Sequence, residues 1–357
     1  MKSILKGSAA ALSLALCAAP ALAQDTAADN TVMAVDEIVA LGFRPDAHGP
    51  AGTMADHVHK SGDVMVALSW MHDSHGGTNR RGTAPISDAA IVAAGYTAKT
   101  TAMTMDMAML HVMWAPSDRV TLMLVPSWMR MDMTMEGIAP GVAHGGHHAL
   151  AVGETMRHTA QGIGDTQLGA LVSLSRRPAL SLHAGLMVSA PTGDARRKDE
   201  DGNYLHYMMQ GGSGTWDLNP SLTAHGLAGG IGWGAQVAYL FRAEKKNAAG
   251  FRFGDRFTAT TWLSAPVTPR LSLSARAAWS SEGKVEGHYN SGHNHAAPAD
   301  RQANYGGQKL EAGLGANVML GDRLRLGLEA NVPVYQDLHG IQLPKRWGAS
   351  AGIGVMF

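Results

Sequence analysis

Apolar and polar residues alternate with a period of two along most of the chain, which is the spacing of β-strands and not of helices. The clearest example is the segment 347–357, where the odd positions are apolar and the even positions are Gly, Ser and one Met. The segments 310–320 and 324–332 repeat the alternation, with Gly, Asn and charged residues on the second face. About 12 such strands can be counted by this criterion, which predicts an all-β chain.

The connections between these strands alternate between short and long. Short turns at one rim, long loops at the other and an even number of strands are typical of outer-membrane barrels. We therefore expect a single antiparallel transmembrane β-barrel of the outer membrane, with short periplasmic turns and long extracellular loops. A soluble periplasmic β-sandwich could also alternate, but it would not need so many small residues on its polar face. The short connections are 116–119, 176–178, 225–230, 266–269 and 321–323, and the long ones include 73–99, 136–164, 192–214 and 282–308.

The composition of the chain excludes several classes of protein. Charged residues make up 16% of the chain and Gly is frequent, with 43 residues, so a disordered polyelectrolyte does not fit. Beyond the N-terminus no apolar run approaches the ~18 residues of a transmembrane helix. The 29 basic and 29 acidic residues cancel, and no basic tract interleaved with aromatic residues appears, so we expect no nucleic-acid partner. The chain has no P-loop, dinucleotide fingerprint or nucleophile elbow, and we expect neither enzymatic activity nor a required cofactor.

The first residues predict a cleaved signal peptide over 1–23. Lys2 and Lys6 precede an apolar stretch, and small residues end at Ala23 before Gln24. The only cysteine, Cys17, lies inside the signal peptide, so the mature chain has no thiolate chemistry. We then expect a periplasmic N-terminal segment over 24–61 and the outer-membrane β-barrel over 62–357, in the outer membrane of a Gram-negative bacterium.

The stretch from Val35 to Gly42 resembles the short box by which outer-membrane receptors engage an energy-coupling protein of the inner membrane. That resemblance implies an inner-membrane partner. The alternative is a simple leader to the barrel.

Five short motifs occur in order along the chain. They are Gly162-Ile163-Gly164-Asp165, Pro191-Thr192-Gly193-Asp194, Gly214-Thr215-Trp216-Asp217, Val334-Tyr335-Gln336-Asp337-Leu338-His339-Gly340 and the terminal Phe357. Together they resemble an outer-membrane transporter family associated with the meta-pathway of phenol degradation. The resemblance implies a barrel in the outer membrane and transfers no substrate or catalytic residue. The segment 50–60 is similar to a Met- and His-rich branch of such transporters.

Ten of the 21 methionines fall in one predicted hairpin and all share one strand face, which we expect to be the lumen. A turn centred near Ser117 would pair Met105 with Met129, Met103 with Met131, and His111 with Met123. The opposite face carries Leu, Val and Trp, as a lipid surface should. This register turns Asp106 and Asp132 outward, where we expect them near the extracellular rim. The ladder comprises Met103, Met105, Met107, Met109, His111, Met113, Met123, Met129, Met131, Met133 and Met135.

Thioether sulfur is a soft ligand that selects Cu(I) or Ag(I) over hard cations. The alternative is that Met is only a flexible apolar filler, which we prefer for the isolated Met65, Met187 and Met319. Histidines cluster in the expected loops, where imidazole would suit Cu(II), Zn or Ni. The alternative is that these Gly- and His-rich loops are simply soluble surface segments. Those predicted as metal-contacting are His144, His147, His148 and His158, while His72 with His75, and His288, His293 and His295, repeat the theme on the same rim.

Three functions follow from these patterns. The first is an outer-membrane channel or receptor-like barrel that handles copper, as bound Cu(I) or Cu(II), or another soft metal ion through a Met-lined lumen. The second is a channel for small aromatic or apolar molecules, in which Met is an adaptable lining. The third is a metal-buffering surface protein that conducts nothing. All three place the barrel wall in outer-membrane lipid.

Overall fold

A computed structural model describes residues 44–141 and 150–357 of the chain. The predicted signal peptide, the stretch from Val35 to Gly42, and His144, His147 and His148 lie outside the described residues. None of the helices within these ranges has the length and apolar character needed to cross a membrane.

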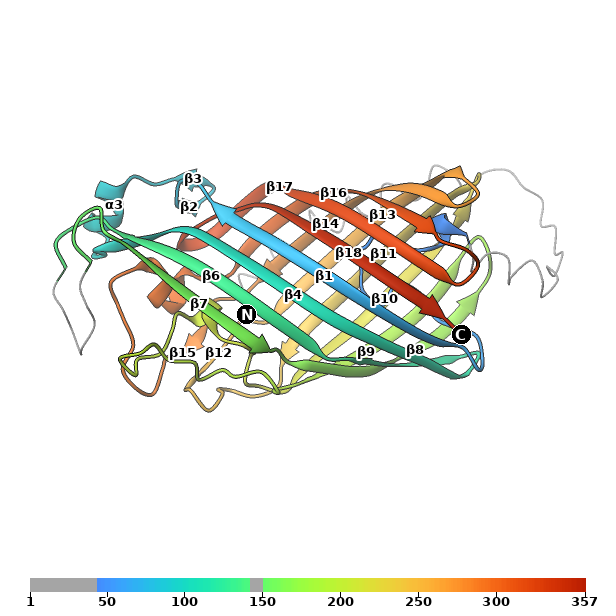
Figure 1. Cartoon of the computed structure of the whole chain (residues 1–357), viewed down its shortest axis with the longest axis horizontal. Coiled ribbons are helices and arrows are strands. Elements are labelled where there is room, and N and C mark those ends of the chain that lie inside the picture. Colours follow the sequence, from blue (N-terminus) through green and yellow to red (C-terminus); the bar gives the residue numbers. More distant parts are fainter. Residues whose placement is uncertain (1–43, 142–149) are drawn as a thin grey trace, which may run out of the picture. The chain divides into compact units, whose positions relative to one another are not determined.

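The described chain forms a closed, 12-stranded antiparallel barrel, as the sequence predicts. Closure comes from β1, which pairs with β18 on one edge and with β4 on the other (Figure 1). The barrel elements are β1 (Val64–Gly76), β4 (Ala98–Ser117), β5 (Val120–Val125), β6 (Ser127–Gly137), β7 (Thr155–Ile163), β8 (Thr166–Arg176), β9 (Ser181–Ala190), β10 (Asp217–Ala228), β11 (Ile231–Arg242), β13 (Arg256–Thr268), β14 (Leu271–Glu282), β16 (Gly307–Met319), β17 (Leu324–Gln342) and β18 (Lys345–Met356).

Two of the 12 barrel strands are each interrupted once. β5 and β6 both pair with β4 and are separated by Pro126, which has no backbone N–H to donate to a ladder. Next to that break, Gly164 and Asp165 separate β7 from β8. Beyond the break, β7 pairs with β6 only, whereas β8 pairs with both β5 and β9. The wall is therefore locally irregular beside the methionine-bearing strand β6.

Side chains alternate between the two faces of the wall as the two-residue period predicts. Leu314, Leu328 and Ile353 point outward and are exposed, while Asn317, Glu329 and Ser350 on the same strands are buried inside. Trp70, Trp114 and Trp128 are likewise exposed on the outer surface, where an aromatic girdle belongs.

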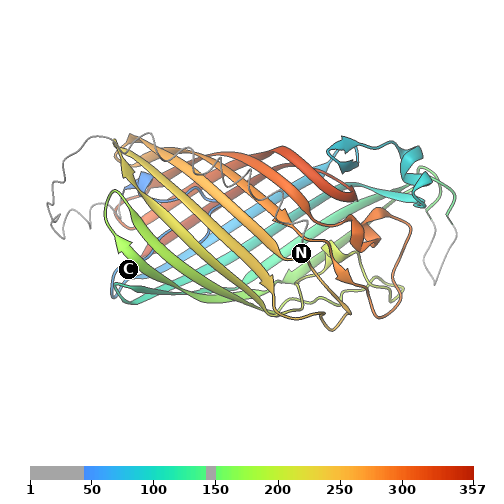
Figure 2. The same ribbon diagram turned by 180° about the vertical axis from the view of Figure 1, so that it is seen from behind.

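Short turns and long loops lie at opposite ends of the barrel. Figure 2 shows the wall from β9 to β16 running from the turns near the C-terminus to the long loops at the other end. The loops carry small elements of their own, which the sequence pattern did not predict. They are β2 (Arg80–Gly82), β3 (Ala84–Pro85), α3 (Asp88–Ala93), η3 (Tyr207–Met209), β12 (Phe251–Arg252), β15 (Glu286–Gly287), η4 (Pro298–Asp300) and η5 (Gln302–Asn304).

Residues 44–60, which we call the plug, lie against the inner wall at the end with the short turns. The helix η2 (Pro45–Ala47) packs on β11, β13, β14 and β16. Further along, Ala55 O accepts a bond from His183 on β9, and His59 N–H donates to Thr121 on β5. This part of the segment 24–61 is thus held inside the barrel by groups on several strands.

A buried ion pair anchors the plug to the wall. Arg276 on β14 contacts Glu329 on β17 at 2.6 Å, and both side chains are buried. The second carboxylate oxygen of Glu329 accepts the backbone N–H of Gly52, at 2.9 Å. One carboxylate therefore neutralises a wall cation and holds the plug backbone.

We expect Glu329→Gln to destabilise the folded protein by about 3–5 kcal/mol, because Arg276 would remain buried without its counter-charge. The free energy of unfolding of the refolded protein, measured by denaturant titration, checks this. The matched control is Glu286→Gln, which breaks an exposed pair with Arg252 and should cost less than about 1 kcal/mol. Equal effects of the two substitutions would contradict the anchoring role.

Candidate functional site

The methionine ladder faces the lumen, as predicted, but its register differs from the prediction. Met103 pairs with Met133, Met105 with Met131 and Met113 with Met123, so the turn centres on Asp118 and Arg119. The predicted register, built on Ser117, is wrong by two residues. Because two is one full strand period, every methionine stays on its predicted face.

The ladder is wider than the predicted hairpin. Met65 and Met71 on β1 face Met113 and Met107, and Met187 on β9 packs against the same cluster. The sequence pattern suggests that Met65 and Met187 are isolated packing residues, but both belong to this inner surface. Their contribution was missed because they come from strands distant in the sequence.

The extracellular end of the ladder is covered by two loops that fold inward. Tyr207 and Met209 of η3 are fully buried, and Met209 packs with Leu205 and Ala297 against the outermost methionines. The sequence predicts these loops as long and polar, and gives no signal that they turn into the barrel. Because they fold inward, these loops enclose the extracellular end of the lumen.

A histidine that sequence analysis missed, His206, lies where the loops meet the ladder. Its Nδ1 is 2.6 Å from an oxygen of Asp300 and its Nε2 is 2.9 Å from the sulfur of Met135. The ring of His158, a predicted metal-contacting residue on β7, lies edge-on to His206 at 5.7 Å. Imidazole nitrogen and thioether sulfur thus meet at one buried point.

Electrostatics favour a charged His206–Asp300 pair. Burial lowers the pKa of His206, but the adjacent Asp300 carboxylate outweighs burial, so the pKa is raised overall. Burial likewise raises the pKa of Asp300, and His206 outweighs it, so the pKa of this carboxyl is lowered. The pair contributes stability between the two shifted pKa values.

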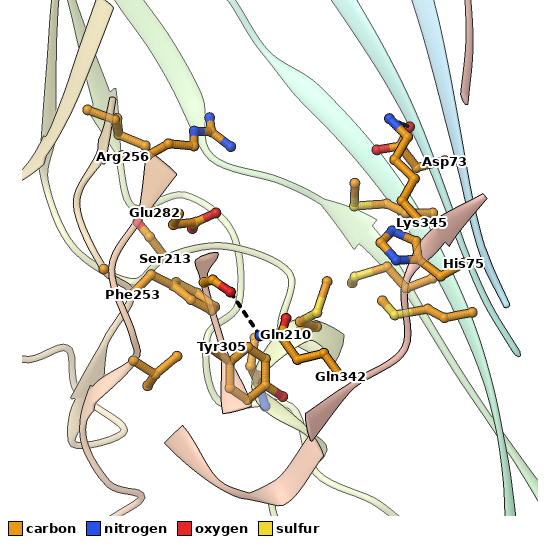
Figure 3. A pocket seen from close by; sticks show the side chains of 18 of the residues that line it. Asp73, His75, Gln210, Ser213, Phe253, Arg256, Glu282, Tyr305, Gln342 and Lys345 are labelled. Carbon is orange, nitrogen blue, oxygen red and sulfur yellow. Dashed lines mark hydrogen bonds and ion pairs between the residues drawn. The ribbon is translucent and has the colours of Figure 1, made fainter. Parts of the chain in front are cut away.

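A cavity of about 460 Å³ lies alongside the ladder. Figure 3 shows His75, Asp73 and Lys345 on one side of it and Arg256, Glu282 and Phe253 on the other. Lys345 is held at 2.7 Å from both Asp73 and Glu311. The methionines that line the cavity are Met103, Met105, Met107, Met109, Met129, Met131, Met133, Met187 and Met208.

The other predicted histidines are dispersed. His111 faces the lumen, where its Nε2 lies 2.8 Å from the Ser69 hydroxyl. His72 and His75 were expected in a loop, but both lie within β1, on opposite faces, because this strand extends further than its alternation suggests. His75 lines the cavity, and His72 contacts Asp106 at 2.8 Å. His288, His293 and His295 do lie in a loop, with the rings of His293 and His295 in contact.

Asp106 and Asp132 point outward, as predicted, and both have side-chain partners on the outer surface. Asp132 accepts bonds from Arg130 at 2.9 Å and Arg157 at 3.0 Å. His72 partners Asp106 and stacks on Trp70. These carboxylates therefore do not belong to the lumen.

Two of the sequence motifs, and the residue that precedes a third, meet at one carboxylate, that of Asp165. Its two oxygens accept the backbone N–H groups of Gly193 at 3.0 Å and Ser213 at 2.7 Å. The Thr192 hydroxyl also donates to Gly164 O, at 2.9 Å. The motifs thus fasten both ends of the inward loop to the break between β7 and β8.

A family model described as "Putative MetA-pathway of phenol degradation" matches residues 111–343, which is more than half of the chain. The chain belongs to this family. The match covers β5 to β17 and includes Asp165 with the motifs around it. None of the curated proteins matches the chain.

Two solved structures are similar to this chain. An outer membrane channel from Pseudomonas putida F1 is similar over 85% of this chain and 99% of its own, with 13% identity and a TM-score of 0.56. The translocator domain of the autotransporter NalP from Neisseria meningitidis covers 85% of this chain and 90% of its own, at 12% identity and a TM-score of 0.44. The first likeness supports the fold of an outer-membrane barrel.

The His206–Asp300 pair predicts a pH dependence. The raised pKa of His206 means that its stabilisation is present below the unfolded value of about 6.5 and is lost as the pH rises through the folded pKa. Asp300→Asn should lower the titration midpoint of His206. Histidine NMR of the labelled protein, with His206→Gln for assignment, measures that midpoint. An unchanged midpoint in Asp300→Asn would contradict the pairing.

Proposed function

We propose that this outer-membrane barrel is a channel or receptor-like protein that handles a soft metal ion, Cu(I) or Ag(I), along its methionine ladder. The ion would be a substrate passed between weak sites and not a resident cofactor. Conduction requires sites strong enough to admit an ion and weak enough to release it, and a row of thioethers meets that requirement.

One observation carries the proposal, the uniform chemistry of a single strip of wall. Every inward position of β4 from 103 to 109, and of β6 from 129 to 135, is a methionine. The paired register puts them opposite one another in successive rows. An apolar filler would mix Leu, Val and Phe into these positions, since such side chains pack with better-defined rotamers.

Further nitrogen and sulfur donors lie at both ends of the methionine ladder, which supports a path for a soft metal ion. At the outer end, His206 and His158 add imidazole to the sulfur of Met135. At the inner end, Met54 of the plug packs against the cluster that contains Met109 and Met113. Transfer to the periplasm would require the plug to move or to accept the ion.

A second candidate is a channel for small apolar or aromatic molecules. The cavity favours it, because Leu240, Phe253 and Val285 join the methionines in its lining. Methionine adapts readily to varied apolar shapes, so the same wall could hold an organic solute. The two candidates differ in whether sulfur itself is needed.

Replacing Met103, Met105, Met129 and Met131 by Leu tests this difference. We expect the variant to lose Cu(I) binding, measured by titration of the refolded protein against a competing chelator, because Leu keeps the volume and removes the ligand. Met319→Leu, at a buried methionine outside the cavity lining, is the control and should bind as the wild type does.

Circular dichroism of both variants checks that the barrel is folded. Equal Cu(I) binding by the wild type and the four-Leu variant would contradict a metal path. If liposome uptake of an apolar solute were then normal in the variant, the second candidate would be favoured.

A further inference from the structure

Four ionisable side chains of the plug form a cluster separate from the methionine ladder. One ligand atom each of His48, Asp56 and His57 lies within 4.8 Å of the others. The ring of His57 lies edge-on to that of His48 and to that of His59, at 4.8 Å in each case. Two stretches of the plug, around 48 and 56–59, therefore bring three imidazoles and a carboxylate together.

Three nitrogens of these rings are buried without a hydrogen-bond partner. They are Nδ1 of His48, Nε2 of His57 and Nε2 of His59. An unpaired buried polar atom is costly, and three in one cluster need an explanation. A bound cation would supply the missing partner to imidazole lone pairs.

Asp56 contacts the ring of His57 in the way that a carboxylate commonly contacts a metal-bound histidine. One of its oxygens lies 2.8 Å from Nδ1 of His57, and the other accepts the Gly49 N–H at 2.7 Å. Such a contact fixes the orientation and tautomer of the ring. The carboxylate is therefore held from both sides, next to the unpaired nitrogens.

The charged groups near the cluster do not prevent it from binding a cation. Arg325 acts on the cluster as a positive charge, and Asp56 offsets it. Arg176 donates to the backbone oxygen of His59 and not to its ring. The wall histidines that face this part of the plug, His183 and His225, are in ring contact with each other.

We propose that His48, Asp56 and His57, with His59 packed against His57, form a binding site for a divalent transition ion of the Zn²⁺ type. Imidazole and carboxylate ligands select Zn²⁺, Co²⁺, Ni²⁺ and Cu²⁺, whereas thioether selects Cu(I). An ion held by His48 and His57 links two arms of the plug and stabilises its folded form. This site is independent of the proposed Cu(I) path.

Co²⁺ titration of the full-length mature protein tests the site, because imidazole-bound Co²⁺ has visible absorption bands. We expect a saturable band that Zn²⁺ displaces and that the double variant His48→Gln/His57→Gln lacks. His225→Gln is the matched control, since it removes a lumen imidazole with a buried unpaired nitrogen outside the cluster. It should keep the band.

Asp56→Asn distinguishes a metal site from simple packing. We expect it to weaken Co²⁺ binding by about 10- to 100-fold, the usual effect of losing a carboxylate beside metal-bound histidine. Circular dichroism of each variant shows whether the barrel is intact, and Asp56→Asn serves if the double variant does not fold.

Three results would overturn the inference. They are no saturable band in the wild type, a band that persists in the folded double variant, or equal loss in His225→Gln. The four-Leu ladder variant should keep the Co²⁺ band, because thioether does not hold this ion. The two proposals can fail separately. A protein that binds Co²⁺ but not Cu(I) contradicts only the Cu(I) path along the ladder, and one that binds Cu(I) but not Co²⁺ contradicts only the plug site.

Discussion

Closure of the barrel through β1 is the constraint on which the rest of the structure depends. A strand edge left open in hydrocarbon would expose backbone N–H and C=O groups that lipid cannot satisfy, so the sheet must pair its first strand with its last. Pairing of β1 with β18 and β4 achieves this. Once the sheet is closed, each residue faces either lipid or lumen, and strand parity alone decides which. The methionines face the lumen for this reason, before any ligand chemistry is considered.

The interior that closure creates is filled from both ends. At the periplasmic end the plug supplies polar atoms to inward groups such as Glu329, His183 and Thr121. At the extracellular end the loop between β9 and β10 is fastened by Asp165, and its η3 packs on the methionines. The sulfur-lined strip thus lies between two imidazole groups, one near His206 and one in the plug. Ligand softness changes along the lumen, from nitrogen to sulfur and back to nitrogen.

The sequence was sufficient for the features that depend on local periodicity. Strand number, the direction of each face, the outward Asp106 and Asp132 and the alternation of turns and loops all follow from a period of two. The predicted pairing register around Ser117 is wrong by two residues, but the face assigned to each methionine is still correct, because a shift by an even number of residues leaves every side chain on the same face of the sheet. His72 and His75 were misplaced in a loop, since strand ends have weak signals. The coming together of His206 with Met135, and of His48 with His57, depends on loop and plug conformations that have no repeating pattern.

Uniform side-chain chemistry on one strip of wall is a stronger indication of function than any single residue in it. Membrane insertion demands only that outward positions be apolar, and elsewhere the inner face is mixed, with polar residues such as Ser272, Thr223 and Arg276 beside apolar ones such as Leu171 and Trp262. Nothing in barrel folding therefore requires methionine at successive inward positions of β4 and β6. Packing would accept Leu at each of them at small cost, since Leu and Met have similar volumes. The property that Leu lacks and all these positions share is a polarisable sulfur, which is why the ladder and not the cavity volume carries the proposed function.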